Sequence, residues 1–147
     1  MNIVITPLGR KLIVAGVALF LLGLFQGALI PAFLNPRMAL SAHLAAVQSG
    51  MAMAIFGLIW NMVNLGDRLL RVAYYTNIAG MYAVWFAISL AAFVGASRAL
   101  PIAGQGFAAT PTGESAVELI VTAGALATVI SVALIFAGLL RTPRDSV

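Results

Sequence analysis

The sequence predicts an all-α integral membrane protein with a bundle of four transmembrane helices. Hydrophobic residues make up 63% of the 147-residue chain and charged residues only 8%, whereas a soluble domain carries roughly 25% charged residues. Apolar runs long enough to span a bilayer recur along the chain, and none has the polar face that a soluble helical bundle requires. Because the runs are continuous rather than alternating, they do not fit the strands of a membrane β-barrel. A single domain over residues 1–147 accounts for the whole chain.

Four segments are predicted to be membrane helices, each long enough for roughly 30 Å of hydrocarbon at about 1.5 Å per residue. They cover approximately residues 12–30, 40–63, 72–96 and 116–140. The first follows Arg10 and Lys11 and is expected to end at Pro31 and Pro36, since proline interrupts a helix. The short basic connection 64–71 predicts an antiparallel hairpin of the second and third helices. The connection 97–115 is longer and rich in Gly, Pro and Thr.

The distribution of basic residues predicts the orientation in the membrane. Arg37 and Arg98 fall on one side, and six residues fall on the other: Arg10, Lys11, Arg68, Arg71, Arg141 and Arg144. By the positive-inside rule, both termini are expected in the cytoplasm. The net charge of +4 sits at helix ends, so no nucleic-acid partner is expected. The chain has no cysteine, which excludes disulfides, iron–sulfur clusters and thiol chemistry.

The second predicted helix carries the only histidine of the chain, His43. At about 100° per residue, this histidine begins a stripe of mostly small residues. The stripe consists of His43, Ala46, Val47, Gly50, Ala54, Gly57 and Asn61. Small residues spaced by four let helices approach closely in lipid. The stripe is therefore expected to pack against another helix, another subunit or a flat ligand.

The chemistry of His43 has three interpretations. The residue is a neutral, hydrogen-bonded histidine near the membrane interface, a general acid or base suited by an imidazole pKa of about 6.5, or an axial ligand to a metal cofactor. A zinc site needs three or four protein ligands, whereas a haem iron needs few because the porphyrin supplies the other nitrogens. This comparison favours haem over other metals without showing that a metal is bound.

Other polar and aromatic side chains lie inside the predicted helices. Gln26, Gln48 and Asn77 are expected to form hydrogen bonds between helices, because a polar group in lipid needs a partner. Tyr82 and Trp85 lie three residues apart on the third helix and share one side of it. They either pack in the core or line a pocket for an aromatic ligand, and periodicity alone does not distinguish the two.

Two carboxylates begin the fourth helix on one face. Glu114 and Glu118 are four residues apart, where the positive end of the helix dipole favours negative charge. Glu114 is expected to cap the helix and remain solvated, whereas Glu118 is expected to meet Arg37 or Arg98. A small multidrug-type transporter would need a membrane-embedded carboxylate to couple protons. Glu118 is the only candidate for that role, which makes the transporter a minor alternative.

Two segments resemble a known enzyme family. "NPRMALSAHLAAVQSGMAMAIFGLIW" (35–60) and "LPIAGQGFAATPTGESAVELIV" (100–121) resemble the bacterial hydroxylaminobenzene mutase family. The second helix is also similar, more distantly, to styrene oxide isomerase. The resemblance implies an intramolecular rearrangement of a small lipophilic aromatic substrate: an aryl hydroxylamine to an ortho-aminophenol, or a styrene-type epoxide to an aldehyde. It further implies a membrane homotrimer carrying haem b, with ferric iron as a Lewis acid.

Carried onto this sequence, the resemblance implies that His43 ligates the haem iron. The neighbouring stripe residues Ala46, Gly50 and Ala54 are then expected to contact the cofactor. The substrate pocket is expected to involve Gln48, Ser49, Asn77 and Tyr82.

The chain departs from the family pattern at the presumed pocket. Ser49 stands where both enzyme types have asparagine, followed by the expected glycine. An ungapped alignment from His43 places Gly80, Val84 and Ile88 where the epoxide isomerase has an acidic residue, an asparagine and a tyrosine. None of these three side chains can donate or carry a proton, which favours the hydroxylamine mutase over the epoxide isomerase. It also leaves a non-catalytic haem-binding membrane protein as an alternative.

Overall fold

The computed structural model describes residues 5–141, and this range contains four long α-helices. They are α1 (Pro7–Ala28), α2 (Pro36–Leu58), α3 (Asp67–Val94) and α5 (Pro111–Leu139). The connections contain the 3-10 turns η1 (Ile30–Ala32) and η2 (Trp60–Met62) and the short helix α4 (Pro101–Gly104). Each long helix is long and apolar enough to cross a membrane. The all-α class and the four long apolar helices are confirmed for the described residues, and the chain has the character of a multi-pass membrane protein.

Three of the long helices begin with a capping side chain followed by proline. Thr6, Asn35 and Thr110 each accept a hydrogen bond from the amide three residues further on, and a proline occupies the next position. Proline suits this position because its missing N–H would have no helical partner. Hydropathy does not detect these polar first turns, so the helices begin four or five residues earlier than predicted. The prediction that Pro36 ends the first helix is wrong, because α1 ends at Ala28 and Pro36 begins α2.

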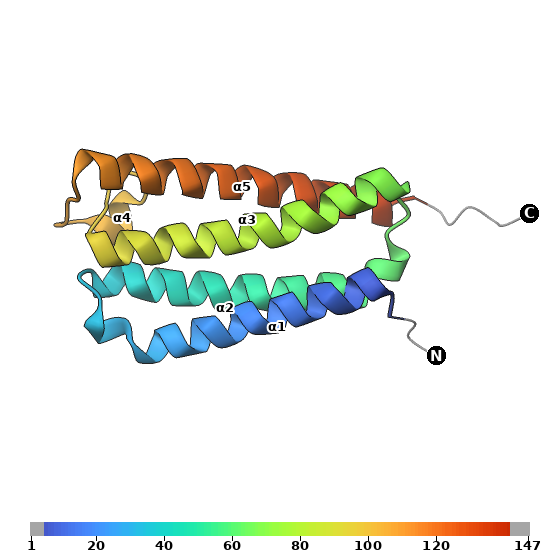
Figure 1. Cartoon of the computed structure of the whole chain (residues 1–147), viewed down its shortest axis with the longest axis horizontal. Helices are drawn as coiled ribbons and strands as arrows, with labels where there is room; N and C mark the ends of the chain where they lie inside the picture. The colour runs from blue at the N-terminus through green and yellow to red at the C-terminus, as the bar shows by residue number, and fades with distance from the viewer. Residues whose placement is uncertain (1–4, 142–147) are drawn as a thin grey trace, which may run out of the picture.

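The long helices lie side by side in the order α1, α2, α3, α5 (Figure 1). α1 packs along α2, and α5 packs along α3; contacts between α2 and α3 join the two pairs. The connection through η2 makes α2 and α3 antiparallel, as predicted. Since α3 is its main neighbour, α5 leaves large apolar side chains such as Leu119, Val129 and Phe136 exposed. Such a surface suits contact with lipid or with another subunit.

The basic residues gather at the ends of the helices. The start of α1, the α2–α3 connection and the end of α5 lie together (Figure 1). We call this the basic end; its described basic residues are Arg10, Lys11, Arg68, Arg71 and Arg141. The α3–α5 connection forms the opposite end, here the loop end, with Arg37 and Arg98. The predicted grouping of basic residues is therefore confirmed for the described residues, and Arg144 lies outside them.

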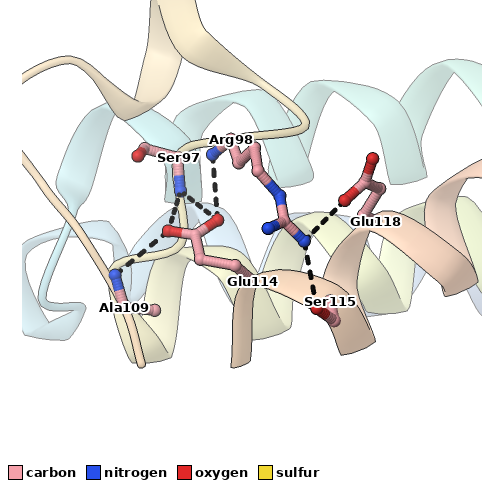
Figure 2. Close-up of polar contacts among 6 residues, drawn as sticks. All are labelled: Ser97, Arg98, Ala109, Glu114, Ser115 and Glu118. Atoms are coloured by element: carbon pink, nitrogen blue, oxygen red, sulfur yellow. Dashed lines mark hydrogen bonds and ion pairs between the residues drawn. The ribbon is translucent and has the colours of Figure 1, made fainter. Parts of the chain in front are cut away.

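The carboxylate of Glu114 organises the loop end (Figure 2). Its side chain is only 8% exposed and accepts hydrogen bonds from the backbone amides of Ser97, Arg98 and Ala109, at 2.9–3.1 Å. These amides lie outside the helices and need an acceptor once buried. The prediction that Glu114 remains solvated is wrong, because the connection folds over the start of α5 and encloses the carboxylate.

Glu118 makes the expected ion pair at the loop end. Its Oε2 lies 2.6 Å from Nη2 of Arg98, and the same nitrogen donates to Ser115 Oγ at 3.1 Å (Figure 2). Both charged side chains are 52% exposed. Because Glu118 is paired and accessible, it does not have the buried position that proton coupling in a transporter requires.

Candidate active site

The small-residue stripe of α2 packs directly against α1. A Cβ atom added to Gly50 would lie 2.6 Å from both the carbonyl oxygen of Gly16 and the backbone nitrogen of Phe20. A Cβ added to Gly57 would lie 2.6 Å from the carbonyl oxygen of Gly9. Only residues without a bulky side chain allow backbones to approach so closely. Of the three partners that the sequence leaves open, the neighbouring helix of the same chain occupies this face.

Other positions of the stripe also face α1. Ala46 is fully buried. A Cβ added to Gly23 of α1 would lie 2.8 Å from the Cβ of Ala46. Ala54 is half-buried, with its backbone nitrogen 2.7 Å from a Cβ added to Gly16. Asn61 does not belong to the stripe, because α2 ends three residues earlier and Asn61 is exposed in η2. Within one chain, Ala46 thus has no surface on which a ligand could rest.

His43 lies in this interface, in the half of α2 nearer the loop end. Its Nδ1 is 2.8 Å from the carbonyl oxygen of Gly23. Since a carbonyl oxygen can only accept, Nδ1 carries a proton; in the neutral imidazole the lone pair is then on Nε2. Gly27 makes room for the ring: a Cβ there would lie 2.8 Å from Nδ1. The side chain is half-buried, and Nε2 forms no hydrogen bond within residues 5–141. Metal-binding histidines are commonly held in this way, with one nitrogen donating and the other free to ligate.

A polar cluster joins α1 and α3 at Gln26, which lies on α1 between the two glycines that contact His43. Trp85 Nε1 donates to Gln26 Oε1 at 2.6 Å, and Gln26 Nε2 donates to Ser89 Oγ at 3.0 Å. Gln26 directly precedes Gly27, which touches the His43 ring. The interhelical role predicted for Gln26 is confirmed. Sequence reasoning does not single out Ser89, because a serine inside a helix usually bonds its own backbone, as Ser89 also does to the Trp85 carbonyl.

Tyr82 also connects α3 to α1. Its hydroxyl donates to the carbonyl oxygen of Ala15 at 2.8 Å. Its ring meets Trp85 edge to face, with 6.4 Å between the ring centroids. Both aromatic side chains are partly buried and pack against the core. The hydroxyl proton of Tyr82 is thus engaged in helix packing, and any contact with a substrate would require it to leave Ala15.

Asn77 lies apart from His43, in the half of α3 nearer the basic end. It is eight residues from Trp85, roughly 12 Å along the helix axis. The side chain is fully buried, and neither amide atom has a hydrogen-bond partner among the described residues. The predicted interhelical hydrogen bond of Asn77 is therefore absent. Ala73 lies one turn before Asn77 on α3, and its carbonyl oxygen accepts a hydrogen bond from Ser131 of α5 at 2.9 Å.

The remaining predicted pocket residues lie on α2 one to two turns beyond His43. Ser49 is half-buried and Gln48 is exposed. Neither side chain forms a hydrogen bond within the described part of the chain, so the interhelical bond predicted for Gln48 is not made inside one molecule. Gln48 sits near the middle of the 23-residue helix α2. Its amide therefore lies on the outer surface of the helix, at a position where water would be scarce in a bilayer.

Comparison with known proteins agrees with this architecture. A family model described as styrene oxide isomerase matches residues 8–140. The chain belongs to the styrene oxide isomerase family. It is similar to hydroxylaminobenzene mutase HabB of Ectopseudomonas oleovorans, with 39% identity over 93% of this chain and 84% of the relative. It is also similar to hydroxylaminobenzene mutase HabA of the same organism, with 38% identity over 74% of this chain and 82% of the relative. No solved structure matches it.

Membership of the styrene oxide isomerase family and similarity to two mutases group the chain with isomerases. In this chain, the α3 positions that the sequence resemblance places at the pocket are used for packing. A Cβ added to Gly80 would lie 2.6 Å from the backbone nitrogen of Thr128 on α5. The backbone nitrogen of Val84 lies 3.0 Å from a Cβ added to Gly124, and Ile88 is buried in a core cluster. An acidic side chain at Gly80 would not fit this helix contact.

Proposed function

We propose that this protein is a membrane-embedded isomerase that converts an aryl hydroxylamine into an ortho-aminophenol. The names of the two similar mutases support the substrate class. In this rearrangement the N–O bond breaks and a C–O bond forms at the ortho carbon. The ortho carbon loses its hydrogen as a proton, and the nitrogen gains a proton. Atoms and electrons balance without an external oxidant or reductant. The observation that carries the proposal is the arrangement of His43, whose Nδ1 bonds Gly23 while Nε2 is free.

The residues present fit haem b as a cofactor, with His43 as its single protein ligand. The described residues contain no group of three or more His, Cys, Asp or Glu side chains that could hold a metal by themselves. A porphyrin supplies four nitrogens, so one imidazole suffices. When bound, the iron would supply a Lewis acid for the hydroxylamine oxygen. Because Ala46 and Gly50 are covered by α1, they would support such a site through packing rather than through contact.

The protein's own residues fix the imidazole and keep water away. The hydrogen bond from His43 Nδ1 to the Gly23 carbonyl sets the tautomer and the direction of Nε2. The Gln26–Trp85–Ser89 cluster satisfies polar groups of α1 and α3 internally, so these groups do not require bulk water. Ser49, half-buried and without a partner in the described chain, is our candidate for orienting the substrate oxygen. Exclusion of water strengthens these polar contacts and suppresses side reactions.

The proposed setting is a bacterial inner membrane with the basic end in the cytoplasm. The described basic end carries five basic residues and one acidic residue, Asp67. The loop end carries two basic residues and two acidic ones, Glu114 and Glu118. The positive-inside rule favours the more basic end as the cytoplasmic one. In this orientation both termini are cytoplasmic. A lipophilic aromatic substrate would dissolve in the bilayer and reach the helices laterally.

We further propose that the chain forms a homo-oligomer, with the trimer as the expected state. The supporting observation is Gln48, an exposed amide near the middle of α2. A polar side chain at this depth is unfavourable in lipid and commonly finds a partner on another helix. The exposed apolar surface of α5 offers additional area for association.

The test combines spectroscopy and turnover on protein purified in mild detergent from haem-supplemented cells. Wild type is expected to show a Soret band and to convert phenylhydroxylamine into 2-aminophenol. His43→Ala is expected to lose both, and added imidazole is expected to restore part of each by filling the vacated position. Turnover that survives in His43→Ala without imidazole would contradict the proposed role of His43. Haem-loaded wild type that leaves phenylhydroxylamine unchanged would contradict the substrate class.

A styrene-type epoxide is the second candidate substrate, and the description of the matching family favours it. Conversion of styrene oxide to phenylacetaldehyde by the same preparation would establish this activity. The packing of Gly80 and Val84 against α5 leaves those positions without the acid and amide that the resemblance implies for the epoxide enzyme. Turnover of the hydroxylamine is therefore expected to exceed turnover of the epoxide.

A further inference from the structure

An open cavity of about 710 Å³ lies at the basic end, between the first turns of α1 and Tyr74 of α3. Arg10 and Lys11 line its polar part, and Val14 and Ala18 line its apolar part. The volume falls in the range of small-molecule sites, roughly 300–1,000 Å³. No role proposed above uses this cavity.

The cavity is separate from the proposed active site. The residues of α1 that line it lie between positions 5 and 18. The His43 ring contacts α1 at Gly23 and Gly27. The nearer of these contacts, Gly23, is five residues from Ala18, roughly 7.5 Å along the helix. The residues that line the cavity therefore do not include those that hold His43.

The polar part of the cavity is suited to an anion. Arg10 and Lys11 are adjacent and exposed. The ion pair found among residues 5–141 joins Arg98 and Glu118 at the opposite end of the molecule. Neither cation of the cavity is paired with a described carboxylate. Two neighbouring cations match the charge and the acceptor oxygens of a phosphate group.

Tyr74 supplies the wall of the cavity on α3. The residue as a whole is only 8% exposed. Its ring is fixed between Trp60 and Tyr75, both in edge-to-face contact. Tyr74 therefore forms a rigid, largely apolar wall opposite the first turns of α1.

The apolar part continues from the cations along a single stripe of α1. Lys11, Val14 and Ala18 are separated by three and four residues and so lie above one another on the helix. The two cations lie near the start of α1, and the apolar residues lie further along the helix, toward its middle. A phospholipid has the same order of charge and hydrocarbon along the membrane normal.

We propose that this cavity binds an anionic phospholipid. Its phosphate lies between Arg10 and Lys11, and the first part of an acyl chain lies along Val14 and Ala18. The proposal is independent of the catalytic function, because it uses none of the residues of the active site. It makes the first turns of α1 a site of lipid-dependent stability.

The charge of the site is tested by thermal unfolding in detergent with added phosphatidylglycerol or phosphatidylcholine. For wild type, phosphatidylglycerol is expected to raise the melting temperature several degrees more than phosphatidylcholine. The double variant Arg10→Gln/Lys11→Gln is expected to lose most of that difference. The control Arg68→Gln/Arg71→Gln removes the same charge from the same end, outside the cavity, and is expected to keep it. Equal loss in both double variants would overturn the proposal, because it would mean general attraction to a basic surface.

The apolar part is tested by counting bound phosphatidylglycerol with native mass spectrometry. Ala18→Phe is expected to reduce binding severalfold by filling the cavity. The control Ala28→Phe places the same ring at an exposed position of α1 outside the cavity and is expected to bind as wild type does. Unchanged lipid binding in Ala18→Phe would overturn the proposal. It would also be overturned if inorganic phosphate at millimolar concentration gave the full stabilisation, since the acyl chain would then contribute nothing.

Discussion

Substitution of Gly27 by alanine tests the active site without changing any polar group in it. A Cβ at this position would lie 2.8 Å from His43 Nδ1 and 2.9 Å from Cε1, whereas ordinary contacts begin near 3.4 Å. The difference, 3.4 − 2.8, requires the imidazole to move by about 0.6 Å. Since the Nδ1–O distance to Gly23 is 2.8 Å, a shift of this size can lengthen it beyond the usual hydrogen-bond range of about 2.7–3.2 Å.

Two effects of different size are expected from Gly27→Ala. Loss of one hydrogen bond lowers the free energy of unfolding by about 1 kcal/mol, so the variant remains folded. A misplacement of about 1 Å at a catalytic group can lower the rate roughly 100-fold, so a shift of about 0.6 Å is expected to lower turnover on the order of tenfold. Activity should therefore fall while the elution profile and most of the thermal stability are kept.

The assay follows 2-aminophenol formation from phenylhydroxylamine by chromatography, together with the absorption spectrum of bound haem. Gly66→Ala is the matched control, because the same methyl group there meets nothing within 4 Å. The control is expected to keep wild-type turnover. Wild-type turnover and an unchanged spectrum in Gly27→Ala would refute the inference that the Gly23 carbonyl positions a functional imidazole.

Three other outcomes are expected. Gly50→Leu places a side chain against the backbone of Gly16 and should lower the free energy of unfolding by about 1–3 kcal/mol or more. The change is measured by thermal unfolding, and a wild-type melting temperature would contradict the close α1–α2 contact. Glu114→Gln keeps the size but removes the charge that holds three amides, so the 97–109 connection should be cleaved faster by protease, whereas Glu118→Gln should change cleavage little. Gln48→Leu should shift the purified protein toward smaller assemblies in multi-angle light scattering, and an unchanged mass would exclude Gln48 from the subunit interface.

Much of the fold follows from local patterns that the sequence contains in full. Four apolar runs separated by polar, proline-containing connections specify four helices, because hydropathy and helix termination depend on neighbouring residues. The helices begin earlier than hydropathy predicts, because the capped first turns at Thr6, Asn35 and Thr110 are polar. The grouping of basic residues at two ends also follows directly from the order of the spans.

The candidate site could be predicted only in part. His43 stands out because it is the only histidine, and the stripe of small residues beside it is visible from periodicity alone. The residue that accepts its hydrogen bond, Gly23, offers only a backbone carbonyl and therefore leaves no signal in the sequence. The partners of Gln26 on α3 are equally invisible, because they lie about sixty residues away along the chain.

The sequence by itself determined the helices, their approximate ends and which residues share a helix face. Only the tertiary structure decided which neighbour covers each face: α1 over Gly50, the 97–109 connection over Glu114, and none of residues 5–141 over Gln48. The physical reason is that lipid tails are as apolar as the helix surfaces, so hydrophobicity does not select partners in a membrane. Close fit of small residues and a few hydrogen bonds make that selection, and both depend on atoms brought together from distant parts of the chain.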